Sequence, residues 1–360
     1  MTYRIIIEPT AEREIRSAVR WRNDIQEDAG MARVVRFHEI GGPEVLRIEE
    51  VEVPPPGKGE VQIRIHALGL NRAEVMFRSG QYLEEPKLPA RLGYEAAGTV
   101  AAIGPGVQGF KIGDAVSTIP SFSLNDYGLY GDLANAPVHA VTHHPASLSW
   151  AEAAAVWMQY LTAYGALIDL ADLKSGETVV IPAASSSVGL AAIQIANKVG
   201  ATPIALTRGQ SKRQALLDAG AAHVITTDEQ QDLVKEILGI TGGKGARVVF
   251  DPVGGPTFAK LAGATAHLGT LFLYGALSTE PTPLPTFDLL GKWLTVRGYV
   301  MMEITGDPER LERGKQFVNE GLADGSFKPL IARTFPLEEI ALAHRYLESN
   351  QQIGKIVVTI

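Results

Sequence analysis

The sequence predicts an α/β protein with two parts, a partly open β-barrel followed by a doubly wound parallel sheet. Short strand patterns with many glycines fill residues 31–153, as in small barrels. After about residue 150, apolar strand patterns alternate with helical patterns. Regular β–α alternation is typical of a parallel sheet with helices on both faces. A chain of 360 residues has room for both domains.

In the first part, strands are expected at 34–37, 46–48 and 61–65, and the Pro54–Gly57 segment breaks the pattern between two of them. The uncharged stretch 153–168 is shorter than the roughly 20 residues of a membrane span, so a buried helix is expected there. In the second part, strands are expected at 177–182, 202–207, 223–227 and 354–360, and helices at 187–200, 211–220, 232–243 and 308–325. The segments 246–255, 258–269 and 270–278 continue the alternation of strand and helix.

Composition narrows the class of protein. The formal net charge is −7, which argues against nucleic acid or an anionic membrane as the main partner. The sequence has no cysteine, so it has no disulfides, thiol nucleophiles or thiolate metal sites. The first residues turn charged too early for a signal peptide, and a cytoplasmic protein is expected.

One strand–turn–helix pattern has the form of a nucleotide-binding turn, Ala184-Ser185-Ser186-Ser187-Val188-Gly189. The three glycine positions of a Rossmann turn fall on Ala184, Ser186 and Gly189. The residues are small, Ser187 is expected to cap the helix, and the serine hydroxyls can donate to phosphate oxygens. The alternative is a turn of the same shape that binds no ligand.

The end of the next strand bears on the choice of cofactor. An NAD-binding fold places an acidic residue there for the ribose 2′-hydroxyl. This strand instead ends at Thr207 and is followed by three cations, Arg208, Lys212 and Arg213, with no acidic residue among them. Cations at this place favour a 2′-phosphate, and therefore NADP(H). The alternative is a solvated helix start.

From Met31 to Ile360 the chain resembles the medium-chain dehydrogenase/reductase superfamily, and within it the zinc-free quinone oxidoreductase branch. The motifs that carry the resemblance are GPEVLRIEEVEVPPPGKGEV, LGLNRAE, GYEAAGTVAAIGPGV, LTAYGAL, AASSSVGLAAIQIA and IGKIVV. The resemblance implies a GroES-like barrel from 31–153 and 302–360, and a Rossmann NADP-binding domain from 154–301. The active site would lie in the cleft between them.

The resemblance also indicates which residues stand where zinc-dependent members hold their metal. These positions are Asn71, Tyr94 and Met158, a set unsuited to zinc. His139, His143 and His144 suggest a metal site by composition, but structural or surface histidines are the stronger interpretation. No metal site is therefore expected.

Without zinc, the hydride acceptor has to be electrophilic already, as quinones and α,β-unsaturated carbonyls are. By resemblance, Tyr82 is expected to act as oxygen donor or acid and Asn71 to position the substrate, with Tyr94 and Tyr127 as weaker candidates. The alternatives are a loop tyrosine and a helix-capping asparagine. The nicotinamide ribose should border Thr162 and the segment Tyr274-Gly275-Ala276.

The leading hypothesis is an NADPH-dependent, zinc-independent reductase of quinones or enones, which resemblance suggests is a homodimer. The alternatives are a non-enzymatic NADPH-binding protein of the crystallin type and a zinc-free alcohol or carbonyl dehydrogenase. Residues 1–30 form an extension outside the resemblance, with a strand pattern at 3–7 and a charged helical pattern at 11–25, similar to the start of ParE/RelE-type toxins. An upstream start codon, a fused fragment and an arm used in assembly are the alternatives for this segment. We expect this extension to be dispensable, with Met31 as the functional start.

Overall fold

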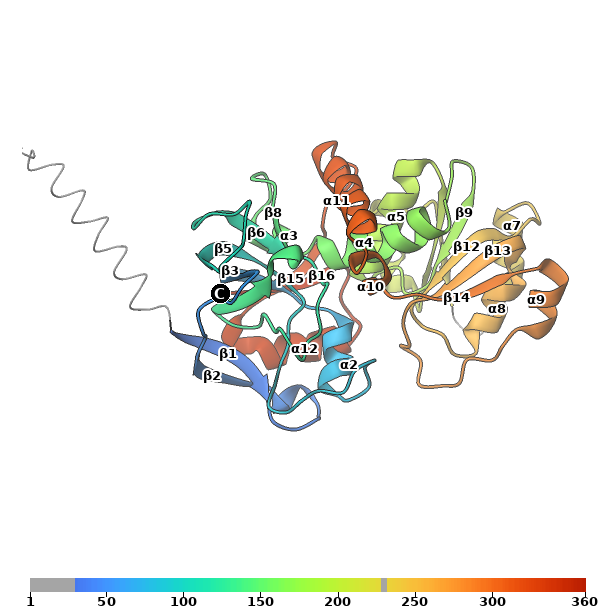
Figure 1. The fold of residues 1–360 in the computed structure, drawn as a ribbon. Helices are drawn as coiled ribbons and strands as arrows, with labels where there is room; N and C mark the ends of the chain where they lie inside the picture. Colours follow the sequence, from blue (N-terminus) through green and yellow to red (C-terminus); the bar gives the residue numbers. More distant parts are fainter. Residues whose placement is uncertain (1–29, 228–231) are drawn as a thin grey trace, which may run out of the picture.

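The computed structural model of the chain describes residues 30–227 and 232–360, which form two lobes (Figure 1). The strand and helix expected for the N-terminal extension lie outside the described residues. No helix in the described part combines the length and apolar character needed to cross a membrane.

The first lobe is a β-barrel to which both ends of the described chain contribute. Its strands are β1 (Met31–Phe37), β2 (Arg47–Glu52), β3 (Glu60–Gly69), β4 (Ala90–Arg91), β5 (Glu95–Ile103), β6 (Ala115–Thr118), β7 (Leu133–Pro137), β8 (Val141–His143), β15 (Ile331–Pro336) and β16 (Lys355–Thr359). The main sheet runs β15-β16-β3-β5-β6-β8, with β7 also paired to β3, and a smaller sheet runs β2-β1-β4. The tail strand β16 pairs with β3 with Val357 opposite Gly69, so the C-terminus completes the barrel.

The second lobe is the predicted parallel sheet. Its strands are β9 (Thr178–Ile181), β10 (Thr202–Thr207), β11 (His223–Thr226), β12 (Ala246–Asp251), β13 (Thr265–Leu273) and β14 (Thr295–Gly298). Their order is β11-β10-β9-β12-β13-β14 and every pair is parallel. This is the dinucleotide-binding order, in which ligands bind at the carboxyl ends of the strands where the order reverses, here between β9 and β12.

The helices cover the sheet and join the lobes. They are α2 (Arg72–Arg78), α3 (Trp150–Ala153), α4 (Trp157–Tyr164), α5 (Ser187–Val199), α6 (Arg213–Asp218), α7 (Leu233–Ile240), α8 (Thr257–Gly263), α9 (Thr286–Lys292), α10 (Met302–Thr305), α11 (Pro308–Ala323) and α12 (Ile340–Glu348). Short turns are η1 (Pro43–Val45), η2 (Val138–Ala140), η3 (Gly165–Leu170, a π turn), η4 (Gln210–Lys212) and η5 (Leu337–Glu339). The uncharged stretch expected to be a buried helix is buried, mostly as α4 and η3.

The lobes meet at α4. Met158 of this helix packs against the hydrophobic cores of both lobes. Helix α11 contacts α4, and its Leu311 and Val318 belong to the core of the Rossmann side. The division proposed from the sequence assigned residues 302–360 to the barrel. Packing instead places α11 with the Rossmann core and the later strands β15 and β16 with the barrel.

Candidate active site

The turn between β9 and α5 lies at the carboxyl end of β9, where the strand order of the parallel sheet reverses. Its left-handed residue is Ala183, with φ of 48°, one position before the predicted bend at Ala184. Helix α5 is capped by Ser186, whose Oγ accepts the Gly189 N–H at 3.1 Å. The prediction that Ser187 is the cap is wrong, because Ser187 is already the first helical residue. Gly189 is required for packing, since a Cβ there would lie 2.6 Å from the Ala184 carbonyl oxygen.

This turn has features that fit an anionic ligand. The N–H groups of Ser187 and Val188 lie in the first turn of α5, where helical N–H groups have no intrahelical acceptor. Ser185 to Val188 are half-exposed, so these groups are accessible. A helix N-terminus with accessible N–H groups favours phosphate oxygens.

The turn is also attached to the barrel lobe. The carbonyl oxygen of Ser185 accepts the Gly354 N–H at 2.9 Å, and Ser186 forms a β-bridge with Gly354. The ammonium of Lys212 donates to Ser185 Oγ at 3.0 Å and to the carbonyl oxygens of Asn350 and Gln352. The nucleotide turn and the segment after α12 are therefore one connected unit.

A cation cluster lies at the end of β10, consisting of Arg72, Arg208 and Lys212. Thr207 is buried at the end of the strand, while Arg208 is exposed. Burial and the neighbouring Arg208 lower the pKa of Lys212. Arg72 comes from α2 in the other lobe; it donates to the Leu347 carbonyl oxygen at 2.9 Å, and burial chiefly lowers its pKa, with Arg208 contributing. The sequence indicated two of these cations but not Arg72.

The residues expected near the nicotinamide lie at the neighbouring strand ends. Tyr274 follows β13, stacks on Phe250 at 3.9 Å between ring centroids, and has a buried hydroxyl with no partner in the described part of the chain. Gly275 approaches Pro252 closely, and Ala276 is exposed. Thr162 lies on α4, which packs on α5, and its hydroxyl donates to the Met158 carbonyl oxygen at 2.5 Å.

The barrel lobe has a buried polar network around Asn71. The Lys355 ammonium donates to Asn71 Oδ1 and to Glu95 Oε2, each at 2.6 Å. Asn71 donates through Nδ2 to the Gly69 carbonyl oxygen, and its backbone N–H donates to Glu74. Asn71 directly precedes α2, as predicted by the alternative in which it is a helix-capping asparagine. Its amide is held by protein groups on both sides.

Glu74 links this network to two tyrosines. Its carboxylate accepts the Tyr130 hydroxyl at 2.6 Å and the Tyr94 backbone N–H at 2.9 Å. Burial raises the pKa of Glu74. Burial also raises the pKa of Tyr82 and of Tyr94, whose hydroxyls lie beside each other. Both phenols therefore keep their protons at neutral pH and can donate.

Tyr127, the other weaker candidate, is separated from Tyr94 by the ring of Phe122, which packs against both tyrosines. Its hydroxyl donates to Glu60 at 2.8 Å, and burial raises its pKa to about 12. The residue lines a separate hollow on the barrel.

The three residues at the positions where zinc-dependent members hold their metal do lie close together, but they surround the network of Lys355. Glu95, which binds Lys355, also accepts the Met158 backbone N–H at 3.1 Å, so Asn71, Tyr94 and Met158 surround one network. No three His, Cys, Asp or Glu side chains within residues 30–227 and 232–360 are grouped to hold a metal. The suspected histidines have separate partners: the carbonyl oxygens of Ser121, Gly109 and Pro145 for His139, His143 and His144.

Comparison with known proteins gives consistent matches. The zinc-binding dehydrogenase model matches residues 187–319 and the alcohol dehydrogenase GroES-like domain model matches residues 57–146. Human quinone oxidoreductase is 32% identical over 331 residues, which cover 91% of this chain and 98% of that protein.

Solved structures agree with this. The Escherichia coli quinone oxidoreductase, determined in complex with NADPH, superposes with a TM-score of 0.83 at 32% identity, covering 91% of this chain and 99% of that one. A structure described as an NAD-dependent alcohol dehydrogenase gives a TM-score of 0.82, also at 32% identity, with coverage of 91% and 99%. The chain therefore belongs to the quinone oxidoreductase family of the medium-chain dehydrogenase/reductase superfamily.

Proposed function

We propose that the protein is a cytoplasmic, NADPH-dependent oxidoreductase that reduces quinones or α,β-unsaturated carbonyl compounds without zinc. The observation that carries this proposal is the cation cluster of Arg72, Arg208 and Lys212 beside the accessible N-terminus of α5. In a chain with a net charge of −7, three cations at this strand end favour the 2′-phosphate of NADPH. The similarity to an NADPH complex supports the same cofactor.

The residues around the carboxyl ends of the strands fit this cofactor. The N–H groups of Ser187 and Val188 and the serine hydroxyls would hold the pyrophosphate. Thr162 and the segment Tyr274 to Ala276 would border the nicotinamide. NADPH, when bound, supplies a hydride.

The tyrosine pair would serve the acceptor. Adding hydride to an enone or a quinone places negative charge on an oxygen, and a hydroxyl donor lowers the energy of that charge. Tyr82 is half-exposed and Tyr94 is buried beside it. Tyr82 would hold the acceptor oxygen and pass its proton to it, with Tyr94 supporting its hydroxyl. Asn71 would position the acceptor through the network it shares with Lys355.

The residues at the centre of the network support the proposed zinc independence. The Lys355 ammonium donates to Asn71 and Glu95. A divalent cation at this point would need negatively charged or neutral ligands, and an ammonium group is neither. An ammonium group at this point disfavours a second cation. Without a metal, the acceptor we propose is electrophilic by itself, as quinones and enones are.

The test is NADPH oxidation with a panel of quinones and enones in chelator-treated buffer, with NADH in parallel. We expect turnover that prefers NADPH and does not change with the chelator. Turnover that chelation abolishes would contradict the zinc-free mechanism. Oxidation of an alcohol by NADP⁺, without quinone or enone reduction, would favour a dehydrogenase. Tight NADPH binding without any turnover would favour the non-enzymatic alternative.

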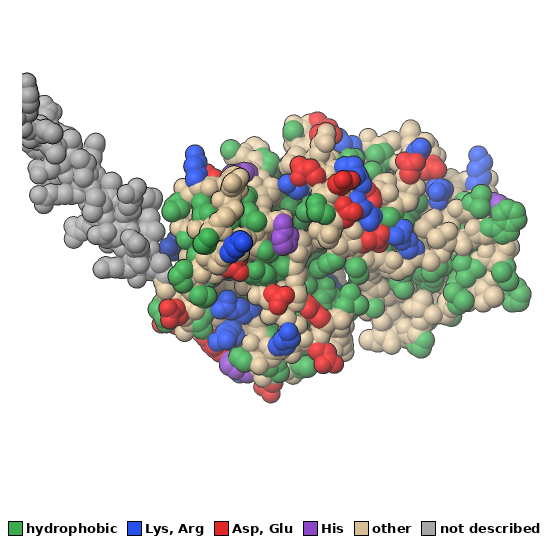
Figure 2. All heavy atoms as spheres, viewed as in Figure 1, with side chains coloured by type: hydrophobic (Ala, Val, Ile, Leu, Met, Phe, Trp, Pro, Cys, Tyr) green, Lys and Arg blue, Asp and Glu red, His purple; other side chains and the backbone are tan. Residues whose placement is uncertain are grey.

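The exposed edge of the Rossmann sheet supports the homodimer. Strand β14 is the last strand of that sheet, and the adjacent α9 region exposes large apolar side chains: Leu284, Phe287, Leu290 and Trp293 are 67, 90, 69 and 67% exposed. Figure 2 shows hydrophobic side chains at this end of the molecule. An edge strand beside an apolar surface is a site for pairing with another chain, here a second copy.

A further inference from the structure

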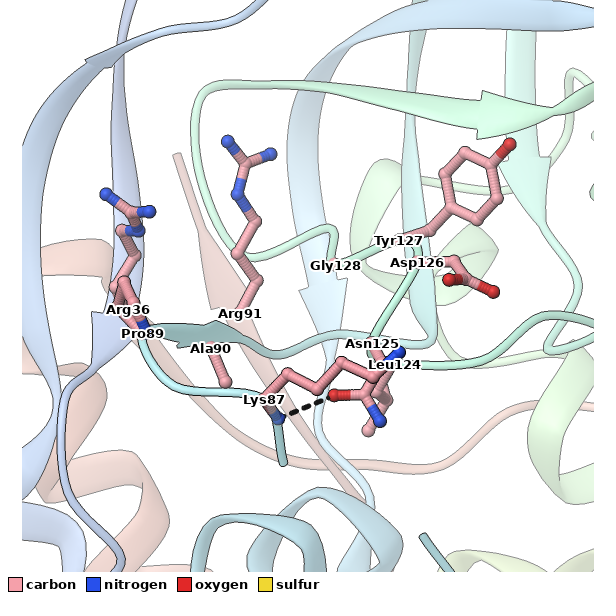
Figure 3. A pocket seen from close by; sticks show the side chains of 10 residues that line it. All are labelled: Arg36, Lys87, Pro89, Ala90, Arg91, Leu124, Asn125, Asp126, Tyr127 and Gly128. Carbon is pink, nitrogen blue, oxygen red and sulfur yellow. Dashed lines mark hydrogen bonds between the residues drawn. The ribbon is translucent and has the colours of Figure 1, made fainter. Parts of the chain in front are cut away.

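A hollow on the barrel lobe lies between β1, β4 and the loop 124–128 (Figure 3). It has a volume of about 170 Å³ and is lined by Arg36, Lys87, Pro89, Ala90, Arg91, Leu124, Asn125, Asp126, Tyr127 and Gly128. None of the residues proposed to hold NADPH, and neither Asn71 nor Tyr82, contributes to this lining. Strand β1 lies on the side of the barrel away from the Rossmann sheet (Figure 1). The hollow therefore shares no residue with the NADPH site proposed above.

Two arginines face each other across the strands that form one wall. In the antiparallel pair of β1 and β4, Arg36 is directly opposite Arg91. Directly opposed residues have their side chains on the same face of the sheet, and like charges at such positions are destabilising. Figure 3 shows both guanidinium groups turned to the same side. Burial, with Arg36 as the charged neighbour, lowers the pKa of Arg91.

These two cations are poorly compensated by protein groups. Arg36 forms one long ion pair, in which its Nη1 lies 3.4 Å from a carboxylate oxygen of Glu49. Its Nε is buried and has no hydrogen-bond partner in the described part of the chain. Within residues 30–227 and 232–360, the Arg91 guanidinium has neither a hydrogen bond nor an ion pair. A half-buried guanidinium without acceptors costs free energy that a bound anion would recover.

The remaining charged residues of the lining are one lysine, Lys87, and one aspartate, Asp126. Lys87 is exposed at the rim, where its backbone N–H donates to Asn125 at 2.8 Å. The single carboxylate of the lining, Asp126, forms no ion pair with these cations within the described residues. The lining thus holds three cations and one anion, in a protein whose net charge is negative.

We propose that this hollow binds a small tetrahedral oxyanion of the phosphate class, held by the guanidinium groups of Arg36 and Arg91 with Lys87 at the rim. Guanidinium groups bind phosphate oxygens with paired N–H donors, so two of them side by side suit an ion with several oxygens. Since a water molecule takes about 30 Å³ of liquid volume, the hollow has room for one such ion and its bound water. Free phosphate and a phosphomonoester share this chemistry.

The test measures thermal unfolding of the full chain, saturated with NADP⁺ so that the cofactor's own phosphate sites are filled. Inorganic phosphate and glycerol phosphate are titrated in turn at constant ionic strength, with chloride as the balancing salt. We expect phosphate to raise the Tm of the wild type, because a ligand that binds only the folded state stabilises it. The oxyanion that gives the larger response identifies the free or esterified form as the better ligand.

Three variants locate the response. Arg91→Gln should lose it, and in phosphate-free buffer this variant should have a Tm at or above that of the wild type, because the like-charge pair is gone. Arg91→Lys keeps the charge without the paired donors and should respond less than the wild type. The control Arg345→Gln removes an exposed arginine of α12 and should respond fully. A wild type that responds equally to phosphate and chloride, or an Arg91→Gln variant that responds like the wild type, would overturn the proposal. NADPH turnover of Arg91→Gln is measured separately and bears only on the proposed function.

Discussion

The ammonium of Lys355 lies 2.6 Å from a carboxylate oxygen of Glu95, and both side chains are almost completely buried. The pair joins the last strand of the barrel, β16, to the start of β5 at the cleft. Removal of one partner from a buried ion pair leaves an uncompensated charge, which costs far more than the pair itself contributes. The pair therefore ties the stability of the fold to the geometry of the cleft.

Lys355→Met should lower the free energy of unfolding by about 3–5 kcal/mol, because Glu95 is left buried and unpaired. Urea denaturation measures this. The control is Lys174→Met, which breaks the exposed pair with Asp172 and should leave the free energy of unfolding almost unchanged. The double variant Lys355→Met with Glu95→Gln should recover much of the loss. Equal costs for the buried and exposed lysines would show that the buried pair is not coupled to stability.

Arg208→Gln and Arg72→Gln should each raise the KM for NADPH by about 10- to 100-fold and change the KM for NADH little. The basis is the loss of one charge-assisted bond to the 2′-phosphate, worth roughly 1.5–3 kcal/mol. Steady-state kinetics with both cofactors measure the effect, and Arg345→Gln is the control. Equal changes for NADPH and NADH would contradict the assignment of the cation cluster to the 2′-phosphate.

Tyr82→Phe should slow enone reduction by about 100-fold or more and quinone reduction less, because a quinone needs less help at its oxygen. Rates are measured with one acceptor of each kind. Since burial raises the pKa of Tyr82, loss of its proton should not limit the wild-type rate below pH 10.0. Tyr127→Phe is the control, because that hydroxyl bonds Glu60. Unchanged rates in Tyr82→Phe would leave this tyrosine with a structural role only.

His344 should make the fold sensitive to acid. Burial, with Arg78 and Arg72 nearby, lowers its pKa from 6.5 to about 3. Between these values the unfolded chain binds the proton and the folded chain does not, so this contribution to stability falls as the pH drops from 6.5 towards 3. Urea denaturation across this pH range should show that the free energy of unfolding declines less steeply in His344→Gln than in the wild type. Glutamine keeps an acceptor for Arg78, which lies 2.8 Å from His344 Nδ1 in the wild type. His139→Gln, an exposed histidine, should decline like the wild type.

Phe287→Glu combined with Leu290→Glu should convert the dimer to a monomer, because two charges would enter the apolar surface at the sheet edge. Light scattering gives the mass. Leu342→Glu alters an exposed leucine on α12 and should remain dimeric. A dimer that persists in the double variant would place the interface elsewhere.

Local patterns were sufficient for most of the fold. The alternation of strands and helices after residue 150 depends on hydrophobic periodicity, which each segment carries by itself. Gly189 and the cations Arg208 and Lys212 could be predicted for the same reason, since they lie at fixed offsets from a strand end. The choice between Ser186 and Ser187 as cap could not, because either serine has the chemistry and only the backbone path decides.

Contacts between segments that lie far apart in the sequence could not be predicted from it. Lys355 and Asn71 are 284 positions apart, and their bond depends on β16 pairing with β3. Arg72 joins Arg208 only because the lobes close on each other. The opposed pair Arg36 and Arg91 depends on the register of a two-residue strand, β4, which has no periodicity to detect.

The bridge between Ser186 and Gly354 has a consequence for how the cleft can open. It lies in the nucleotide turn itself, so one lobe is fastened to the other where the pyrophosphate would bind. Any opening that preserves the bridge must pivot about the turn, with the largest displacement at the points farthest from it. A relative motion of the lobes that keeps this bridge would leave the nucleotide turn and the segment around Gly354 assembled.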